Sequence, residues 1–370
     1  MIYLDHNATT HMHPNVRKKM QALIDHEPLN PSSLHSYGRK GKSALEAARK
    51  SIAELLGIAD YFSDYQITFT SSGTEANNLI LSNFKDGEIF IASTEHLSIF
   101  AHSKISKNIT IIKVDKNGIL DLEDLTRKLQ VSKNKKKLVS VMLANNETGV
   151  IQPIEQISYI ANNYGALIHS DCVQAVGKIE VNIPKLNVDF ISLSAHKFGG
   201  PMGAGALIGK TSIALRAVLI GGGQERNLRS GTENVPAIVG FGEAAHIAKE
   251  ELSSRFDHMS KLHIKLETEL LKSNHDIEIA GADTIRLPNT SLIMNANKKS
   301  ETQLIALDMH GVAVSSGAAC SSGKITSSHV LSAMGYTENK INSALRISVG
   351  FNTTEQNIDT FLKIYNEINE

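Results

Sequence analysis

The chain has 370 residues, of which 41% are hydrophobic and 21% charged, and its 38 basic residues balance its 38 acidic ones. A chain of this length usually has more than one hydrophobic core, so two domains are favoured. The zero net charge gives no electrostatic reason to expect nucleic acid or an anionic membrane as the main partner. Two cysteines, Cys172 and Cys320, are too few for a disulfide framework, and neither a signal peptide nor an apolar run of about 20 residues is visible, so we expect a cytoplasmic location.

The first two-thirds of the chain alternate between two kinds of pattern. Apolar residues recur at helical spacing over 38–57, and Gly57 is a plausible helix stop. After it, short β-rich segments are separated by segments of helical character, and they cover 66–70, 88–92, 110–114, 138–143, 166–170, 188–193 and 204–208. Such alternation predicts an α/β fold with a mostly parallel seven-stranded sheet flanked by helices on both faces.

The last third has a different organisation. A long helical stretch is predicted from Asn234 to about Leu271, followed by a smaller α/β unit with strands near 290–294, 312–315 and 345–349 and a final helix over 355–368. We place the domain boundary in the long helix, so that residues 13–250 form a large domain and residues 251–370 belong to a small one.

A lysine and an aspartate follow two of the predicted strands. Lys197 comes just after the buried run 188–193, and Asp171 directly follows the run 166–170. A lysine at a strand end is most often a solvated surface residue, but a buried amine can be neutral, and a neutral amine forms a Schiff base with an aldehyde. Pyridoxal phosphate enzymes need such a lysine and a carboxylate for the ring nitrogen, and open α/β sheets bind ligands at their strand ends.

The sequence blocks around these residues resemble those of the cysteine desulfurases, the NifS/IscS group of class V, fold-type I pyridoxal phosphate enzymes. The matching blocks are His169-Ser170-Asp171-Cys172-Val173-Gln174, Ser194-Ala195-His196-Lys197, Tyr3-Leu4-Asp5-His6-Asn7-Ala8-Thr9-Thr10, Thr70-Ser71-Ser72-Gly73-Thr74-Glu75-Ala76-Asn77-Asn78, Thr94-Glu95-His96, Asn145-Asn146-Glu147-Thr148-Gly149, Arg229-Ser230-Gly231-Thr232 and Ser315-Ser316-Gly317-Ala318-Ala319-Cys320. They span nearly the whole chain in the family's order. The resemblance also implies that residues 1–12 pack with the small domain.

The resemblance implies a phosphate-binding set for the cofactor. Gly73 and Thr74 open a helix after a strand, where backbone amides favour an anion, although Ser or Thr before Glu75 is also an ordinary helix cap. By resemblance, Ser194 and His196 add side-chain donors. Thr232 matches a threonine that reaches the phosphate from the partner subunit, which implies a homodimer.

The remaining site residues are also assigned by resemblance. His96 stacks on the cofactor ring and moves protons, while Asn146 and Gln174 lie near the ring's phenolic oxygen. Asn146 also lies near the substrate carboxylate. Arg346 binds that carboxylate with two parallel hydrogen bonds from its guanidinium. Without the resemblance, the alternative interpretation of Arg346 is an ordinary surface ion pair. No metal site is expected.

Cys320 determines the reaction that the resemblance implies. Its neighbourhood, residues 315–324, is rich in Ser, Gly and Ala and is expected to be mobile, as suits a thiol that accepts sulfur at the cofactor and carries it outward. Cys172 is expected to be a small core residue. Where the family usually has Leu-Glu-Pro, this chain has Ile325-Thr326-Ser327, so the proline at the far end of the loop is missing.

We therefore expect a homodimeric, pyridoxal phosphate-dependent cysteine desulfurase. It would convert L-cysteine to L-alanine, with Lys197, Cys320 and His96 as catalytic residues, and pass a persulfide sulfur to an iron–sulfur scaffold protein or a tRNA-thiolation relay. Two alternatives stay open at this point: another class V aminotransferase or lyase, and a non-catalytic sulfur carrier or scaffold.

Overall fold

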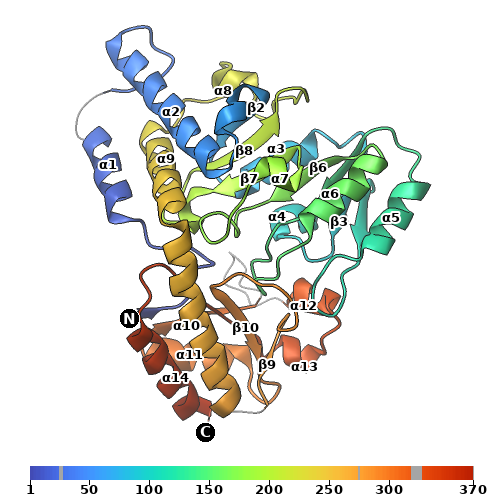
Figure 1. Cartoon of the computed structure of the whole chain (residues 1–370), viewed down its shortest axis with the longest axis vertical. Helices are drawn as coiled ribbons and strands as arrows, with labels where there is room; N and C mark the ends of the chain where they lie inside the picture. Colours follow the sequence, from blue (N-terminus) through green and yellow to red (C-terminus); the bar gives the residue numbers. More distant parts are fainter. Residues whose placement is uncertain (25–27, 274–275, 318–326, 370) are drawn as a thin grey trace.

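The computed structural model describes residues 1–24, 28–273, 276–317 and 327–369. In Figure 1 the larger part of the chain, built on the main sheet, fills the upper half of the view, and the last third of the chain fills the lower half. Helices α9 and α10 run one after the other from the upper half into the lower one, and both chain ends lie in the lower half.

The main sheet has seven strands in the order β2-β8-β7-β6-β5-β3-β4. Only β8 runs antiparallel to its neighbours, and the other pairings are parallel. The mostly parallel seven-stranded sheet predicted from the sequence is confirmed, with strand ends shifted by no more than a few residues. The strands are β2 (Tyr65–Thr70), β3 (Glu88–Ala92), β4 (Ile109–Ile112), β5 (Lys137–Ser140), β6 (Leu167–Asp171), β7 (Phe190–Ser194) and β8 (Gly205–Lys210).

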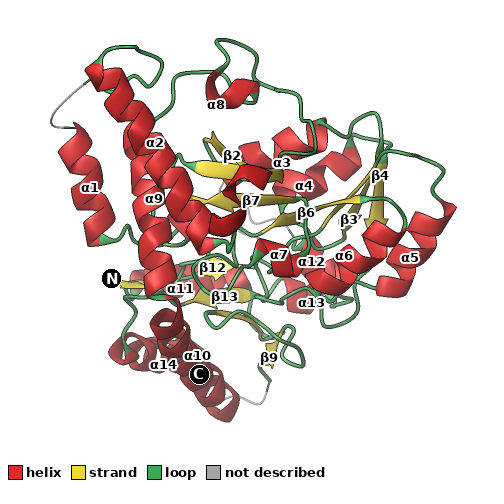
Figure 2. Cartoon of the chain, turned by 45° about the horizontal axis from the view of Figure 1, so that its top comes forward, coloured by secondary structure: helices red, strands yellow, loops and turns green. Residues whose placement is uncertain are grey.

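Helices cover both faces of this sheet, and side chains along each strand alternate between the two layers. In β3, Ile89 and Ile91 pack in one buried cluster with α3, while Phe90 and Ala92 pack in the other with α2 and α9. Helices α1, α2 and α9 lie side by side (Figure 2). The helices of this part are α1 (Pro14–Ile24), α2 (Ser36–Leu55), α3 (Gly73–Ser82), α4 (Leu97–Phe100), α5 (Leu122–Val131), α6 (Ile154–Asn163), α7 (Ile183–Leu186), α8 (Gln224–Asn227) and α9 (Val235–Glu250), with short 3₁₀ turns η1 (Ala59–Asp64), η2 (Ala101–Lys104) and η3 (Ala195–Lys197).

The last third forms a four-stranded antiparallel sheet in the order β12-β13-β10-β9, and a two-stranded parallel sheet joins β1 to β11. Strands β10 and β13 match the prediction, but the single strand predicted over 312–315 is wrong. It is two strands in two different sheets, because the chain crosses from one sheet to the other at Val314. The elements are β1 (Ile2–Tyr3), β9 (Glu278–Ile279), β10 (Thr290–Met294), β11 (Val312–Ala313), β12 (Ser315–Ser316), β13 (Leu345–Ser348), α10 (Leu252–Ser273), α11 (Ser300–Met309), α12 (His329–Ala333), α13 (Glu338–Ile341) and α14 (Glu355–Asn369).

The long helical stretch is divided at Glu251, which ends α9 before α10 begins. Asn234 caps its start by accepting a hydrogen bond from the backbone N–H of Ala237. Helix α9 packs into the core of the main sheet, whereas α10 packs into a separate core with α14 and with Leu4. The division into residues 13–250 and residues 1–12 with 251–370 stays a prediction that these separate cores support. Within the described ranges, no helix is long and apolar enough to cross a membrane.

Candidate active site

A cavity of about 520 Å³ lies at the carboxyl ends of β6 and β7, where the main sheet faces the small one. Asp171 ends β6, Ser194 ends β7, and Lys197 follows in the short turn η3. This edge is where an open α/β sheet presents polar groups to a ligand. All but two of the predicted site residues line the cavity, namely Gly73, Thr74, His96, Asn146, Asp171, Gln174, Ser194, His196, Lys197 and Arg346.

Two predicted site residues are not placed in this cavity. Thr232 is exposed on the surface of the single chain and does not line it. Cys320 lies outside the described residues, so its assignment as the sulfur acceptor stays a prediction. Cys172, in contrast, is fully buried in the core beneath the sheet, as predicted, and burial raises the pKa of its thiol.

Lys197 is held by backbone oxygen atoms of the N-terminal segment. Its Nζ donates hydrogen bonds to the carbonyl of Asn7 at 2.6 Å and to that of Ala8 at 2.8 Å. Burial, with a contribution from the positive charge of Arg346, lowers the pKa of Lys197 to about 8, although Asp5 and Asp171 act in the opposite direction. The amine is therefore much closer to its nucleophilic neutral form than a solvated lysine would be.

Asp171 is connected to His96 through two further side chains. Its carboxylate accepts hydrogen bonds from the Asn77 side chain at 2.7 Å and from the backbone N–H of Val173 at 3.0 Å. The Asn77 amide also donates to the Ser98 hydroxyl at 2.8 Å, and that hydroxyl lies 2.8 Å from Nδ1 of His96. Burial lowers the pKa of His96 despite the opposing effect of Asp171, so the imidazole is neutral near pH 7 and can accept a proton.

The start of α3 combines a helix cap with an open anion site. The Ser72 hydroxyl accepts from the backbone N–H of Glu75 at 3.1 Å, and the Glu75 carboxylate accepts from the backbone N–H of Ser71 at 2.7 Å. The first turn of the ten-residue helix faces the cavity, since Ser72, Gly73 and Thr74 all line it. A Cβ on Gly73 would lie 2.8 Å from Val173 Cγ2, so only glycine keeps this approach open.

Arg346 enters the cavity from β13 of the small sheet. It is 5% exposed, so the alternative of a surface ion pair is wrong, and its guanidinium pairs with Asp5 at 2.8 Å and donates to the Asn146 carbonyl at 3.0 Å. Its Nε is buried and has no hydrogen-bond partner in the described part of the chain. Arg346 therefore carries one donor that the described protein groups leave unpaired beside the cavity.

Two important cavity residues were quoted in the sequence blocks but not assigned a role. Asn7 accepts at its backbone oxygen from Lys197 and from Gln174, while its side chain contacts Thr290 at 2.8 Å. Asn77 bonds Asp171 directly. The sequence signal that could have identified these two residues was their place inside the matching blocks. The blocks do not show which side chains they contact, because a partner such as Thr290 lies 283 positions from Asn7.

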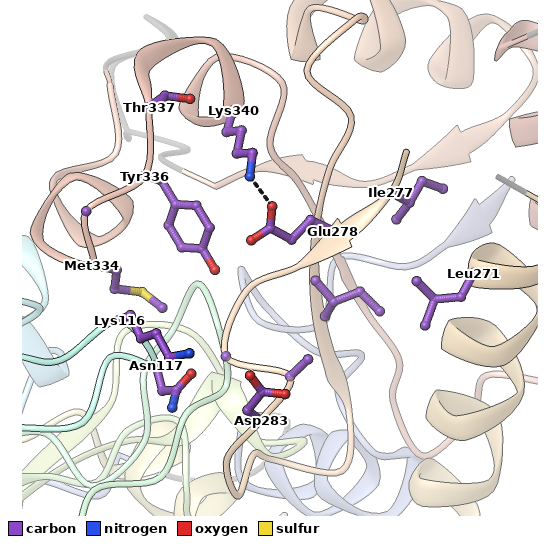
Figure 3. Close-up of a pocket in the computed structure, with 14 residues that line it drawn as sticks. Lys116, Asn117, Leu271, Ile277, Glu278, Asp283, Met334, Tyr336, Thr337 and Lys340 are labelled. Carbon is purple, nitrogen blue, oxygen red and sulfur yellow. Dashed lines mark hydrogen bonds and ion pairs between the residues drawn. The ribbon is translucent and has the colours of Figure 1, made fainter. Parts of the chain in front are cut away.

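The chain also has a second hollow of about 530 Å³, which lies beside β9 and α13 and contains none of the predicted site residues. Figure 3 shows the Tyr336 ring extending into it between Lys340, Glu278 and the turn that carries Asp283. Lys340 and Glu278 pair with each other. Equal volume therefore does not make the two hollows equal in chemistry.

Comparisons with known proteins agree with this geometry. The aminotransferase class-V family matches residues 2–361, and this chain belongs to that family. A cysteine desulfurase IscS of Dictyoglomus turgidum is 37% identical over the whole of this chain and 94% of its own length. A solved NifS-like protein from Rickettsia africae is 45% identical, with a TM-score of 0.95 and coverage of 100% of this chain and 99% of that one. A further structure, described as SspA in complex with cysteine, is 27% identical with a TM-score of 0.79, covering 95% of this chain and 99% of that one.

The family implies pyridoxal phosphate as cofactor, and the residues of the cavity fit it. The cavity offers an amine with a lowered pKa at Lys197, a buried carboxylate at Asp171 and a helix N-terminus at Gly73. These are the three groups needed for the aldehyde, the ring nitrogen and the phosphate. Metal-ligand clusters of three or more His, Cys, Asp or Glu residues are not found in the ranges that the structure describes.

Proposed function

We propose that this protein is a pyridoxal phosphate-dependent cysteine desulfurase that converts L-cysteine to L-alanine and retains the sulfur as a persulfide. The observation that carries the proposal is the meeting of Lys197 and Asp171 in one buried cavity, in a chain whose full length matches cysteine desulfurases. A cytoplasmic location remains an expectation of this proposal.

Each residue of the cavity has a role that follows from its chemistry. When bound, pyridoxal phosphate supplies an electron sink for charge that develops on the substrate. Lys197 would hold the aldehyde carbon, and Asp171, kept in place by Asn77 and Val173, would keep a proton on the ring nitrogen. The neutral imidazole of His96 exchanges protons with the substrate at near-neutral pH.

Arg346 is the substrate-binding cation of the proposal. The free Nε and the partly exposed carboxylate partner Asp5 mean that an incoming α-carboxylate can complete or replace the present contacts of the guanidinium. The substrate's carboxylate is thereby held on the side of the cavity formed by the small sheet, and its amino group is directed toward Lys197.

The sulfur step belongs to Cys320. Its thiolate attacks the substrate sulfur and forms a sulfur–sulfur bond while the carbon–sulfur bond of the substrate breaks, and a proton takes the place of sulfur on that carbon to give alanine. The persulfide sulfur then passes to an acceptor protein, for which we propose an iron–sulfur scaffold or a tRNA-thiolation relay.

We also propose that the active unit is a homodimer. Thr232 is exposed in the single chain, and Arg229, three positions before it, pairs with Glu75 of α3 at 2.9 Å. This segment therefore starts at the phosphate-binding helix and extends outward, as expected if Thr232 serves the partner's cavity. Sedimentation of the active enzyme should show a dimer, and a fully active monomer would refute the proposal.

The test of function separates cofactor binding from sulfur transfer. Cys320→Ala should still bind pyridoxal phosphate and be yellow, because Lys197 and Asp171 are untouched, but its production of alanine and sulfide should fall by about 10²–10⁴-fold. Cys172→Ala is the matched control and should keep most of the activity, with a packing loss of about 1 kcal/mol.

Mass spectrometry of the wild type after brief exposure to cysteine identifies the acceptor. One extra sulfur should map to the peptide that contains Cys320. A persulfide on Cys172, or normal turnover by Cys320→Ala, contradicts the mechanism, and activity that depends on a keto acid without sulfide release indicates a class V aminotransferase instead.

A further inference from the structure

A second lysine, Lys178, is buried just outside the cavity and has no role in the proposed reaction. It is 4% exposed and lies in the turn that follows β6, four positions after Gln174. Its Nζ donates to Gln174 Oε1 at 2.7 Å and to Asn7 Oδ1 at 3.0 Å. Both acceptors belong to residues that line the cavity, although Lys178 itself does not.

The surroundings of Lys178 do not favour its charge. In the described part of the chain its hydrogen-bond acceptors are amide oxygens rather than carboxylates. Burial, together with the nearby cations Lys197 and Arg346, lowers its pKa well below the ordinary value. A neutral amine has two N–H groups, which equals the number of acceptors present. Lys178 thus acts as a buried hydrogen-bond donor. An apolar side chain would cost less free energy to bury, so packing alone does not explain a lysine at this position.

The two bonds determine how the Gln174 amide is oriented. Its oxygen accepts from Lys178, and its Nε2 donates to the backbone oxygen of Asn7 at 3.0 Å. This backbone oxygen of Asn7 also accepts a hydrogen bond from Lys197 Nζ at 2.6 Å. The donor end of Gln174 therefore lies beside Lys197, while the acceptor end is turned away toward Lys178. Without Lys178 the buried Oε1 would have no donor, and the amide could rotate by half a turn.

We propose that Lys178 is a positioning residue that keeps the N–H end of Gln174 directed at the bound cofactor. The inference rests on the proposed function, since it requires pyridoxal phosphate in the cavity. An N–H donor stabilises the more negative, deprotonated form of the group that it faces. Loss of Lys178 therefore raises the pH at which the bound cofactor changes its protonation state.

The test follows the absorption band of the bound cofactor as the pH is raised from neutral to alkaline. Lys178→Met keeps an unbranched side chain that is one atom shorter and removes its donors. It should raise the titration midpoint by about 0.5–1 pH unit, the equivalent of one hydrogen bond. Lys210→Met is the matched control. Lys210 is a partly buried lysine at the end of β8 that pairs with Asp189 at 2.8 Å, and it does not line the cavity. It should leave the midpoint unchanged.

A double-variant cycle shows whether Lys178 acts through Gln174. In a Gln174→Leu background the donor is already absent, so Lys178→Met should cause no further shift. A wild-type midpoint in Lys178→Met, or an equal shift in the Gln174→Leu background, overturns the inference.

If Lys178→Met does not accumulate as folded protein, Lys178→Gln replaces it. It keeps one amide donor and should give a smaller shift in the same direction, so a midpoint equal to that of the wild type again overturns the inference. Failure of the wild type to bind pyridoxal phosphate would instead refute the proposed function itself.

Discussion

Two hollows in the described part of this protein have almost the same volume, about 520 Å³ at the main sheet and about 530 Å³ beside β9, yet they differ in how their charged groups are held. At the main sheet, Asp171 and Arg346 are buried and Lys197 is partly buried. Amide and backbone groups hold all three, and Arg346 also pairs with Asp5. In the second hollow, Lys340 and Glu278 pair with each other and are 38% and 43% exposed.

This difference explains why, of these two hollows, the one at the main sheet is the candidate for catalysis. Desolvation lowers the pKa of Lys197 to about 8, which changes what its amine can do at neutral pH. Exposed charges such as those of Lys340 and Glu278 are screened by water and contribute little. The comparison leads to four predictions, from the largest expected effect to the smallest.

Removal of the amine at the main cavity should have the largest effect. Lys197→Ala should lower cysteine-dependent alanine formation by about 10³-fold or more, because the aldehyde carbon loses its covalent partner. Borohydride reduction of the wild type, followed by peptide mapping, should place the phosphopyridoxyl group on Lys197. Its appearance on another lysine would remove the basis of the assignment.

A conservative change at Arg346 should have a smaller effect. Arg346→Lys keeps a positive charge but loses the planar fork, and it should raise the KM for cysteine by about 10- to 100-fold, the equivalent of one or two charge-assisted hydrogen bonds. Steady-state kinetics check this. An unchanged KM together with a lower kcat would show that Arg346 does not bind the substrate carboxylate.

The lowered pKa of Lys197 also predicts a pH dependence of stability in the cofactor-free protein. Below about pH 8 the partly buried, desolvated ammonium of Lys197 destabilises the fold. This cost disappears as the pH rises toward the ordinary lysine value of 10.5, because between these values the unfolded chain binds more protons than the folded one. Lys197→Met has no such group. Urea denaturation should therefore show that the stability of the wild type relative to this variant increases between about pH 8 and 10. A constant difference would mean that Lys197 titrates normally.

A change in the second hollow should have the smallest effect. Lys340→Ala breaks the exposed ion pair with Glu278 and should lower the free energy of unfolding by less than about 1 kcal/mol, with turnover unchanged. Thermal unfolding and the alanine assay measure the two quantities. A large loss of activity would show that the second hollow communicates with the main cavity, and the contrast between the two would no longer hold.

Much of the fold could be read from local patterns. The strands of the main sheet are buried on both faces, so they appear as short apolar runs between helical segments, and all seven were found. Strands β1 and β9 were missed because two residues are too few to show a period. The strand predicted over 312–315 was wrong because the pattern cannot show that the chain changes sheets at Val314.

The sequence by itself determined the chemistry that is present: a lysine after β7, an aspartate at the end of β6, and a glycine at the start of α3, each at a strand end where a local pattern predicts it. Only the tertiary structure decided which groups complete the cavity. Asn7 meets Lys178 across 171 positions, and Arg346 meets Asp5 across 341. The physical reason is that the period of a strand or helix tells which face a side chain occupies but not which distant side chain lies opposite, and burial and pKa values depend on that neighbour.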